Sequence, residues 1–267
     1  MKYTIIFVFL LSGTTAYAEK TQSKEQRILS SVTLIEWDSK ESMKRLSRSS
    51  HKVDFFPLSN HFVSQENKIF CGLASSAIVL NALRLGQKKG LPQDKRSIGK
   101  NERSWLPKVW NPFFEKYTSR NILNKQTKKR AEILGQPIKI KGKMKKDYGL
   151  QLRQLAQVLR ANQLNVTVRV VNEVMDTETI KKEIFKNLSS KNDFVLVNYS
   201  RKSLGQKGGG HISPLGAYDK KSDSFLIMDV NPNKAPWVWV KAKDLIEAMR
   251  TFDTIENRGY LLISDIK

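Results

Sequence analysis

Residues 65–86 read QENKIFCGLASSAIVLNALRLG, a polar stretch that becomes mostly apolar at Cys71. Apolar residues then recur at helical spacing, at Leu73, Ala77, Leu80 and Leu83, while Ile78 and Val79 widen the stripe. The pattern predicts a largely buried helix that begins at Cys71 and stops near Gly86, because glycine is common just past a helix end. A buried helix headed by a cysteine is therefore the central element of the predicted fold.

The position of Cys71 favours a reactive thiol. The first turn of a helix presents unpaired backbone N–H groups and the positive end of the helix dipole, and both stabilise a thiolate. Gly72 leaves room for a substrate backbone, and the Gln65 side-chain amide could join the Cys71 N–H in a two-donor oxyanion hole. The alternative is a structural cysteine that acts as a small buried hydrophobe.

The chain downstream of this helix predicts mainly strands. Helices are expected over 148–164, 177–188 and 242–250, and strands over 166–171, 194–199, 211–218, 224–230, 237–240 and 260–264. A polar turn, Asp219–Asp223, would join two of these strands as an antiparallel pair. Residues 55–62 predict a loop, and the Lys-rich segment 87–147 predicts helices and loops. Helices followed by a mostly antiparallel sheet indicate the α+β class.

Two strand-borne residues are candidate partners of the thiol. His211 follows three glycines in GGGHISP (208–214), and a histidine beside a thiolate can act as general base and acid. The glycines suggest unusual backbone angles, or a substrate that approaches closely at Gly210. Asp229 lies within the apolar run FLIMDV (225–230), where a carboxylate needs a partner, and the Nδ1–H of His211 would be one.

Each partner also has an ordinary structural interpretation. His211 could be a satisfied core histidine, and Asp229 could cap a turn towards Asn231. Together, however, Cys71, His211 and Asp229 follow the order Cys, His, acid, with a helix-borne nucleophile and strand-borne partners. That order and topology are those of papain-like enzymes, so a catalytic triad is the preferred interpretation.

The composition limits what else the chain can be. Its 267 residues include 47 Lys and Arg against 25 Asp and Glu, a formal net charge of +22, and 40% are hydrophobic, which favours one globular domain over disorder. A single cysteine excludes an intramolecular disulfide. One cysteine and three dispersed histidines also predict no tightly held structural metal or other cofactor.

The first 18 residues have the pattern of an export signal. Lys2 precedes the apolar run IIFVFLL (5–11), and Ala16-Tyr-Ala18 matches a cleavage site. The predicted organisation is therefore a signal peptide over 1–18, a polar lead-in segment over 19–49 and one catalytic domain over 50–267. The expected location is periplasmic or secreted.

Over residues 50–264 the chain closely resembles the catalytic domain of phytochelatin synthases, which are glutathione γ-glutamylcysteinyltransferases with a papain-like fold. The resemblance rests on QENKIFCGLAS (65–75), FVLVNYSRKSLGQKGGGHISP (194–214), FLIMDV (225–230) and WVWVKAKDLIEAM (237–249). It is to the catalytic domain alone, because the cysteine-rich C-terminal region of plant-type members has no counterpart here. We expect a helical lobe followed by a sheet lobe.

The resemblance implies a role for each motif residue. Cys71 would attack the Cys–Gly bond of glutathione, with His211 as acid–base partner, Asp229 orienting that histidine and Gln65 completing the oxyanion hole. Three residues match family positions that hold the γ-glutamyl group, Asn198, Arg201 and Arg258. Glycine would leave, and a second glutathione or water would take the thioester. Cd²⁺ or Zn²⁺ would act as thiolate complexes of glutathione.

Two other functions fit parts of the sequence. A C39-like cysteine peptidase that cleaves a leader peptide also pairs an upstream glutamine with a Cys-Gly helix start. A non-enzymatic, basic, anion-binding exported protein would account for the charge alone. No nucleic-acid-binding module accompanies that charge, so a nucleic acid is not an expected partner. Weak attraction to anionic membrane surfaces and a homodimer are the other partner interactions considered.

Overall fold

The computed structural model describes residues 32–233 and 236–266. The expected signal peptide over 1–18 lies outside these ranges. The described helices are α2 (Lys40–Arg48), α3 (Phe55–Asn60), α4 (Cys71–Arg84), α5 (Lys100–Arg103), α6 (Arg130–Ile133), α7 (Leu152–Ala161), α8 (Thr177–Asn187), α9 (Ala242–Met249) and the 3₁₀ turn η1 (Lys202–Leu204). The strands are β1 (Ile35–Glu36), β2 (Ile138–Ile140), β3 (Lys143–Lys145), β4 (Leu164–Val170), β5 (Asp193–Ser200), β6 (Gly210–Asp219), β7 (Ser224–Ile227), β8 (Val238–Lys241) and β9 (Gly259–Asp265).

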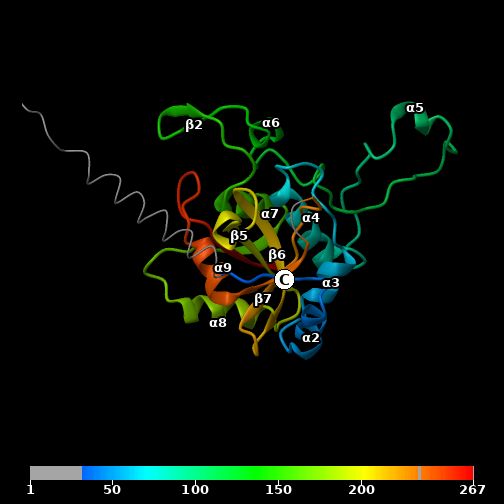
Figure 1. The fold of residues 1–267 in the computed structure, drawn as a ribbon. Helices are drawn as coiled ribbons and strands as arrows, with labels where there is room; N and C mark the ends of the chain where they lie inside the picture. The colour runs from blue at the N-terminus through cyan, green and yellow to red at the C-terminus, as the bar shows by residue number, and fades with distance from the viewer. Residues whose placement is uncertain (1–31, 234–235, 267) are drawn as a thin grey trace, which may run out of the picture.

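A seven-stranded antiparallel sheet forms the centre of the molecule, in the order β1-β8-β7-β6-β5-β9-β4 (Figure 1). The fold therefore mixes helices with a mostly antiparallel sheet, as the sequence predicts. Each predicted downstream strand and helix occurs, with ends displaced by a few residues. The predicted strand over 224–230 ends at Ile227, so Asp229 follows the strand instead of lying within it.

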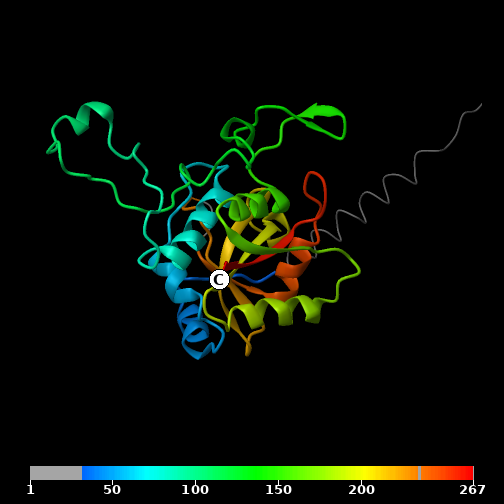
Figure 2. The ribbon, with the colours of Figure 1, turned by 180° about the vertical axis from the view of Figure 1, so that it is seen from behind.

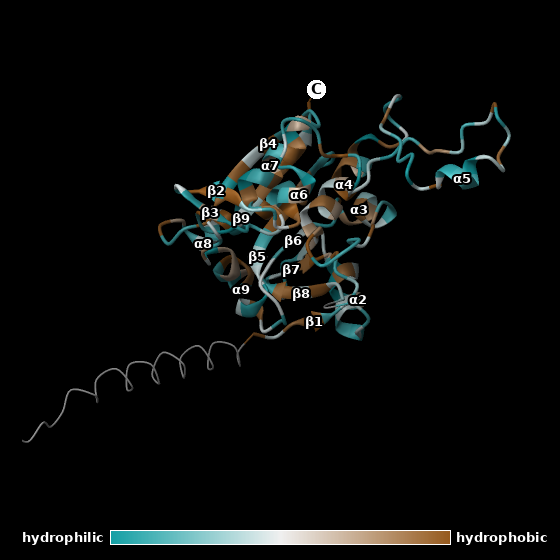
Figure 3. Ribbon diagram, turned by 90° about the horizontal axis from the view of Figure 1, so that it is seen from above, coloured by the Kyte–Doolittle hydropathy of each residue, from teal (hydrophilic) through white to brown (hydrophobic). Residues whose placement is uncertain are grey.

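Helices cover both faces of this sheet. Alternate residues of β5 face opposite sides, since Phe194 and Leu196 belong to one hydrophobic cluster and Val195 and Val197 to the other. The first cluster includes the buried faces of α4 and α7, and the second those of α8 and α9 (Figures 1 and 3). The sheet is thus held between two helical layers, which fixes the strands that carry the candidate site.

The central helix forms as its sequence predicts. Helix α4 begins at Cys71, and its stripe residues Leu73, Ala77, Leu80 and Leu83 are buried. Gly86 lies just past its end with a φ of 80°, in the left-handed region that glycine adopts without strain. The start of this helix at Cys71 places the thiol at the positive end of a 14-residue helix.

Two local predictions are wrong. Residues 55–60 form helix α3 instead of a loop, because Pro57 stands at the third helical position, where its missing N–H would have no helical partner anyway. Within 87–147, β2 and β3 form an unpredicted hairpin. Its two-residue turn, Lys141-Gly142, has φ values of 47° and 80°, as a tight hairpin turn requires.

The end of the predicted lead-in segment is part of the packed structure. Strand β1 pairs with β8 through Ile35 and Trp239. The Trp239 indole donates a 3.0 Å hydrogen bond to Ser42 of α2, and Arg48 of α2 bonds Asp219 at 2.6 Å. Residues from 35 onward therefore contribute to the same sheet as the candidate site.

Two segments project from the body of the molecule (Figures 1 and 2). One carries α5, and we call residues 86–116 the α5 arm. The other is the β2–β3 hairpin. Among the residues that the structure describes, no helix is long and apolar enough to cross a membrane.

Candidate active site

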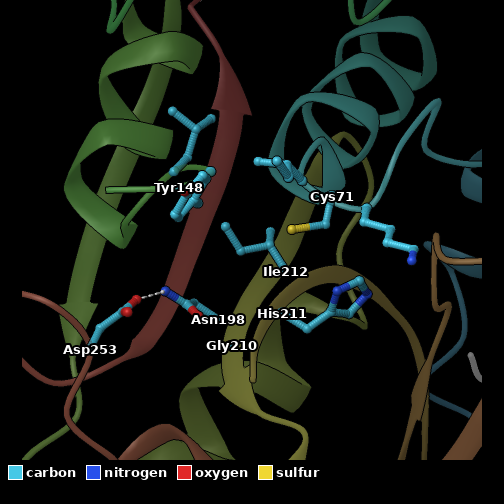
Figure 4. Close-up of a pocket in the computed structure, with 11 residues that line it drawn as sticks. Cys71, Tyr148, Asn198, Gly210, His211, Ile212 and Asp253 are labelled. Atoms are coloured by element: carbon cyan, nitrogen blue, oxygen red, sulfur yellow. Dashed lines mark hydrogen bonds between the residues drawn. The ribbon is translucent and has the colours of Figure 1, made fainter. Parts of the chain in front are cut away.

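Cys71 opens α4 at the wall of a pocket between this helix and the sheet (Figure 4). The side chain is partly exposed. Gly72 behind it is packed closely, because a Cβ there would lie 3.2 Å from Leu150 and 3.3 Å from Ile212. The pocket is lined by Lys68, Ile69, Cys71, Tyr148, Gly149, Leu150, Asn198, Gly210, His211, Ile212 and Asp253.

His211 lies beside the thiol on strand β6. Its ring is buried, it lines the same pocket as Cys71, and its Nε2 lies 2.9 Å from Oδ1 of Asp229. The expectation that Nδ1 would face the carboxylate is wrong, because Nε2 occupies that position and leaves Nδ1 for the thiol. The ring plane is further held by Tyr199, whose ring meets it edge-on at 5.8 Å.

Asp229 combines the two roles that the sequence left as alternatives. Its Oδ1 faces His211 and also accepts the backbone N–H of Asn231 at 2.8 Å, as a turn-capping aspartate does. Its Oδ2 lies 2.6 Å from Arg201 and 3.4 Å from the Tyr199 hydroxyl. The carboxylate is wholly buried, so these partners replace the water that it would otherwise need.

Charges and hydrogen bonds shift all three candidate catalytic groups towards their ionised forms. Burial raises the pKa of Cys71. The interaction with His211 and the backbone groups of Ile212 and Gly72 lower it by more, so the net pKa is below the ordinary value. Burial lowers the pKa of His211, but the hydrogen bonds to Asp229 and Cys71 raise it above normal. Burial raises the pKa of Asp229, but His211 and Arg201 lower it by more, so the net pKa is below the ordinary value. The arrangement stabilises a thiolate–imidazolium pair.

Gln65 lies near the head of α4 but outside the lining of the Cys71 pocket. Its backbone N–H donates to the Val230 carbonyl at 2.8 Å, so Gln65 is held against the residue that follows Asp229. Its side-chain nitrogen donates to the Asn67 carbonyl at 2.6 Å, and its Oε1 is buried with no hydrogen-bond partner among the described residues. That bond uses one of the two amide N–H groups.

Arg201 contacts the protein's own carboxylate instead of the pocket. It is 2% exposed, bonds Asp229 at 2.6 Å and reaches Gln206 at 3.2 Å. It does not line the Cys71 pocket. Its carboxylate partner is Asp229, whereas the other two residues expected to hold a γ-glutamyl group, Asn198 and Arg258, both bond Asp253.

Asn198 and Asp253 lie at the wall of the pocket opposite Cys71 (Figure 4), and Arg258, which bonds Asp253, is not among the lining residues. Asn198 donates to one oxygen of Asp253, and Arg258 donates to the other, each at 3.2 Å. A Cβ at Gly210 would lie 2.9 Å from Arg258, so the glycine accommodates this guanidinium. The Nε of Arg258 is buried with no partner among the described residues.

Sequence reasoning missed Asp253 and a buried lysine. Asp253 lies in the polar segment between α9 and β9, where an aspartate is ordinarily a turn residue. Lys128 is buried, and its ammonium bonds Asp147, Gly149 and Gln154. Asp147 in turn accepts from Thr254 at 3.2 Å. This network joins the two pocket walls, but the sequence shows only one more lysine in a Lys-rich run.

Metal-binding groups are not gathered elsewhere in the described part of the chain. Across residues 32–233 and 236–266, no three His, Cys, Asp or Glu side chains lie together as a metal site would require.

Comparisons with known proteins match most of this chain to one family. The phytochelatin synthase family model matches residues 24–260. Glutathione gamma-glutamylcysteinyltransferase of Schizosaccharomyces pombe is 25% identical over 226 residues, 84% of this chain and 46% of the relative. Glutathione gamma-glutamylcysteinyltransferase 3 of Lotus japonicus is 29% identical over 247 residues, which are 91% of this chain and 44% of the relative. Glutathione gamma-glutamylcysteinyltransferase 1 of Arabidopsis thaliana is 29% identical over 245 residues, which are 90% of this chain and 43% of the relative. The chain spans less than half the length of these relatives.

Proposed function

This chain belongs to the phytochelatin synthase family, and on that premise we propose that it is a glutathione γ-glutamylcysteinyltransferase with a papain-like mechanism. The observation that carries the proposal is that Cys71 and His211 line one pocket while Nε2 of His211 lies 2.9 Å from Asp229. Relatives named for this activity support the choice of substrate.

The first step is acylation of the thiol. The Cys71 thiolate attacks the carbonyl carbon of the cysteinyl residue in glutathione, a C–S bond forms, and the carbonyl electrons move to oxygen. The Cys71 backbone N–H and the second N–H of Gln65 are the proposed donors to that oxyanion. The His211 imidazolium then gives its proton to the leaving nitrogen, the C–N bond breaks, and free glycine departs.

The second step releases the γ-glutamylcysteinyl group. Neutral His211 takes a proton from an attacking nucleophile, which is the amine of a second glutathione or a water molecule. The thioester C–S bond breaks, and the thiolate re-forms. Transfer to glutathione yields a phytochelatin of two γ-glutamylcysteine units, whereas transfer to water yields free γ-glutamylcysteine.

Recognition of the γ-glutamyl head is proposed to rest on Arg258, Asp253 and Asn198. The γ-linkage leaves an α-ammonium and an α-carboxylate free, and a peptide bonded through its α-carboxyl lacks that pairing. The buried Nε of Arg258, which has no partner among the described residues, suits the carboxylate, and the Asp253 carboxylate suits the ammonium. Asn198 holds Asp253 from the strand side.

The direct test is to incubate the protein with glutathione under reducing conditions and identify products by mass. We expect glycine with γ-glutamylcysteine, phytochelatin or both from the native protein, and none from Cys71→Ser with an unchanged melting temperature. Glycine release by the Cys71→Ser protein would overturn the covalent mechanism. Cleavage of a leader peptide ending in Gly-Gly, with glutathione untouched, would favour the C39-like alternative.

A second test isolates the recognition residues. Losing a charge-assisted contact costs about 1.5–3 kcal/mol, so Arg258→Ala should lower kcat/KM about 10- to 150-fold. Arg153→Ala is the matched control, because Arg153 is an exposed arginine whose partner, Glu256, lies in the same segment before β9. A large fall in melting temperature with little kinetic loss would make Arg258 a purely structural residue.

Metal ions enter the proposal as part of the substrate. Cd²⁺ or Zn²⁺ would bind the glutathione thiol and present a metal–thiolate complex to the enzyme. Adding Cd²⁺ should then change product formation with glutathione but not with S-methylglutathione, whose sulfur is already blocked. Equal stimulation of both substrates would indicate a metal site on the protein.

Export is proposed as well, from the pattern of residues 1–18. The mature protein should begin at Glu19 in a periplasmic or secreted fraction. N-terminal sequencing checks this directly, and a soluble cytosolic protein that begins at Met1 would contradict it.

A further inference from the structure

The α5 arm, residues 86–116, exposes large apolar side chains far from the candidate active site. Trp105 is 79% exposed, Val109 100%, Trp110 58% and Phe114 82%. All four lie within ten positions of the chain, directly after α5, on the segment that projects from the body (Figures 1 and 3). Soluble proteins seldom leave so many large apolar groups together in water, so this exposure indicates a contact surface.

The same arm is strongly basic. It contains eight Lys and Arg against three Asp and Glu, a net charge of +5, and the basic residues are Lys88, Lys89, Lys95, Arg96, Lys100, Arg103, Lys108 and Lys116. Lys95, Lys100 and Lys108 are exposed, and no salt bridge occupies them in the described structure. The surface that offers the aromatic groups therefore carries positive charge that its own carboxylates do not neutralise.

The arm is held in shape instead of being a loose tether. Gln93 and Glu115 form an antiparallel bridge near its base, and Glu115 also accepts the backbone N–H of Gly90 at 2.9 Å. Within the arm, the Arg103 guanidinium lies 5.0 Å from the centre of the Phe113 ring. These contacts leave the exposed aromatic groups on an ordered support, which lowers the entropy cost of docking.

We propose that the α5 arm binds the surface of an anionic lipid bilayer. Tryptophan side chains prefer the headgroup region, where an apolar ring and a polar N–H are both accommodated, and lysines attract anionic lipid headgroups. Charge complementarity selects this occupant, because Trp105, Trp110 and Phe114 stand among uncompensated lysines. The contact is peripheral, and the candidate active site stays outside the bilayer.

The test is co-sedimentation of the full-length protein with vesicles. We expect binding to vesicles of phosphatidylcholine with about 30% phosphatidylglycerol and much less to phosphatidylcholine alone, with binding falling as salt increases, as electrostatic attraction to anionic lipid requires. Replacing Trp105, Trp110 and Phe114 by alanine should weaken binding more than about tenfold. Val174→Ala with Met43→Ala is the matched control, because both residues are exposed apolar groups outside the arm.

A second set of variants tests the charge. Replacing Lys95, Lys100 and Lys108 by glutamine should weaken binding about 100-fold at low salt. The same change at Lys182, Lys186 and Lys191, which are exposed on and after α8, should weaken it far less. Tryptophan emission should shift to the blue on vesicle addition, and the shift should be lost with Trp105 and Trp110.

Specific results would overturn the proposal. Equal vesicle binding by the native protein and the triple alanine variant would show that the aromatic side chains do not contact the bilayer. Equal loss of binding in both lysine sets would show that the overall positive charge, and not the arm, attracts the protein to the vesicles. A protein that ignores both vesicle types but forms a dimer that the triple alanine variant abolishes would make the arm a self-association surface. Glutathione turnover in the absence of vesicles should be unchanged in all arm variants.

Discussion

Arg201 Nη2 lies 2.6 Å from Oδ2 of Asp229, while Oδ1 of the same carboxylate lies 2.9 Å from Nε2 of His211. The pair is buried, so the arginine balances a charge that has almost no contact with water. Removing one member of a buried pair costs about 3–5 kcal/mol. Arg201 thereby acts as a positioning residue for the histidine's partner.

Arg201→Met should lower both stability and activity. With no guanidinium, the Asp229 pKa rises and the carboxylate supports the imidazolium less well. We expect a lower melting temperature, and a fall in kcat/KM of at least about tenfold at pH 8 even at temperatures where the variant is fully folded. Arg201→Lys should restore part of both. Native kinetics in a destabilised Arg201→Met protein would limit the residue to a structural role.

The Cys71 thiol should titrate below its ordinary pKa. Because it is the chain's single cysteine, the rate of alkylation by iodoacetamide against pH measures that pKa directly. In His211→Ala the lowering hydrogen bond is gone and burial remains, so the midpoint should move above the native one. An unchanged midpoint would show that the histidine does not contribute to thiolate stability.

Asp229→Asn should narrow the pH range of activity from the alkaline side. The aspartate raises the His211 pKa, and turnover requires the imidazolium to protonate the leaving glycine. Without the carboxylate, that pKa falls, and the alkaline limb of the kcat/KM profile should move to lower pH. A uniform loss with no displaced limb would instead indicate a change in the geometry of the ring.

Lys128→Met should loosen both pocket walls at once. The ammonium lies 2.7 Å from Asp147 Oδ2 and also bonds the Gly149 carbonyl, so its removal leaves a buried carboxylate without a counter-ion. A loss of about 3–5 kcal/mol in the free energy of unfolding is expected. The loosened walls of Lys128→Met should also raise KM for glutathione. Adding Asp147→Asn to this variant should recover stability while KM stays raised. Lys129→Met, an exposed neighbour, is the control.

Stability should also depend on Asp54, which is 1% exposed and whose Oδ2 has no partner among the described residues. Burial, and next the Asp193 charge, raise the Asp54 pKa to about 9. Between about pH 4 and 9 the folded chain therefore holds a proton that the unfolded chain has released, so this group destabilises the fold as pH rises.

Asp54→Asn should accordingly raise the free energy of unfolding by about 1–3 kcal/mol at pH 8 and by less at pH 5. Thermal melts at both pH values compare it with Asp38→Asn, which alters an exposed aspartate. Identical gains at the two pH values would contradict the raised pKa.

Local patterns predicted the elements that carry the candidate chemistry. The helical spacing of apolar residues predicted α4 and its first residue, and the runs 194–199 and 211–218 predicted β5 and β6, whose residues are buried almost throughout. Helix α3 was missed because Pro57, Ser59 and Asn60 together favour a loop, although Pro57 lies in the first turn of the helix. The β2–β3 hairpin was missed because lysines mask its short alternation.

Contacts between distant segments were beyond such patterns. The partner of Arg201 is set by how η1 and β6 pack behind the end of β7. The sequence alone does not distinguish a buried arginine from an exposed one. Asp253 and Arg258 meet because the segment before β9 folds back over Gly210. Neither relation has a periodic signal, since both depend on tertiary packing.

The wide separation of Cys71 and His211 along the chain has a consequence for folding. The two residues are 140 positions apart, and β9, the last strand, must insert between β5 and β4 to complete the sheet beneath them. Loops of this length close slowly and late. Until these segments meet, the single thiol of a newly made or refolding chain lacks the His211 partner that lowers its pKa. Pulse alkylation during refolding would therefore time the meeting of α4 with β6.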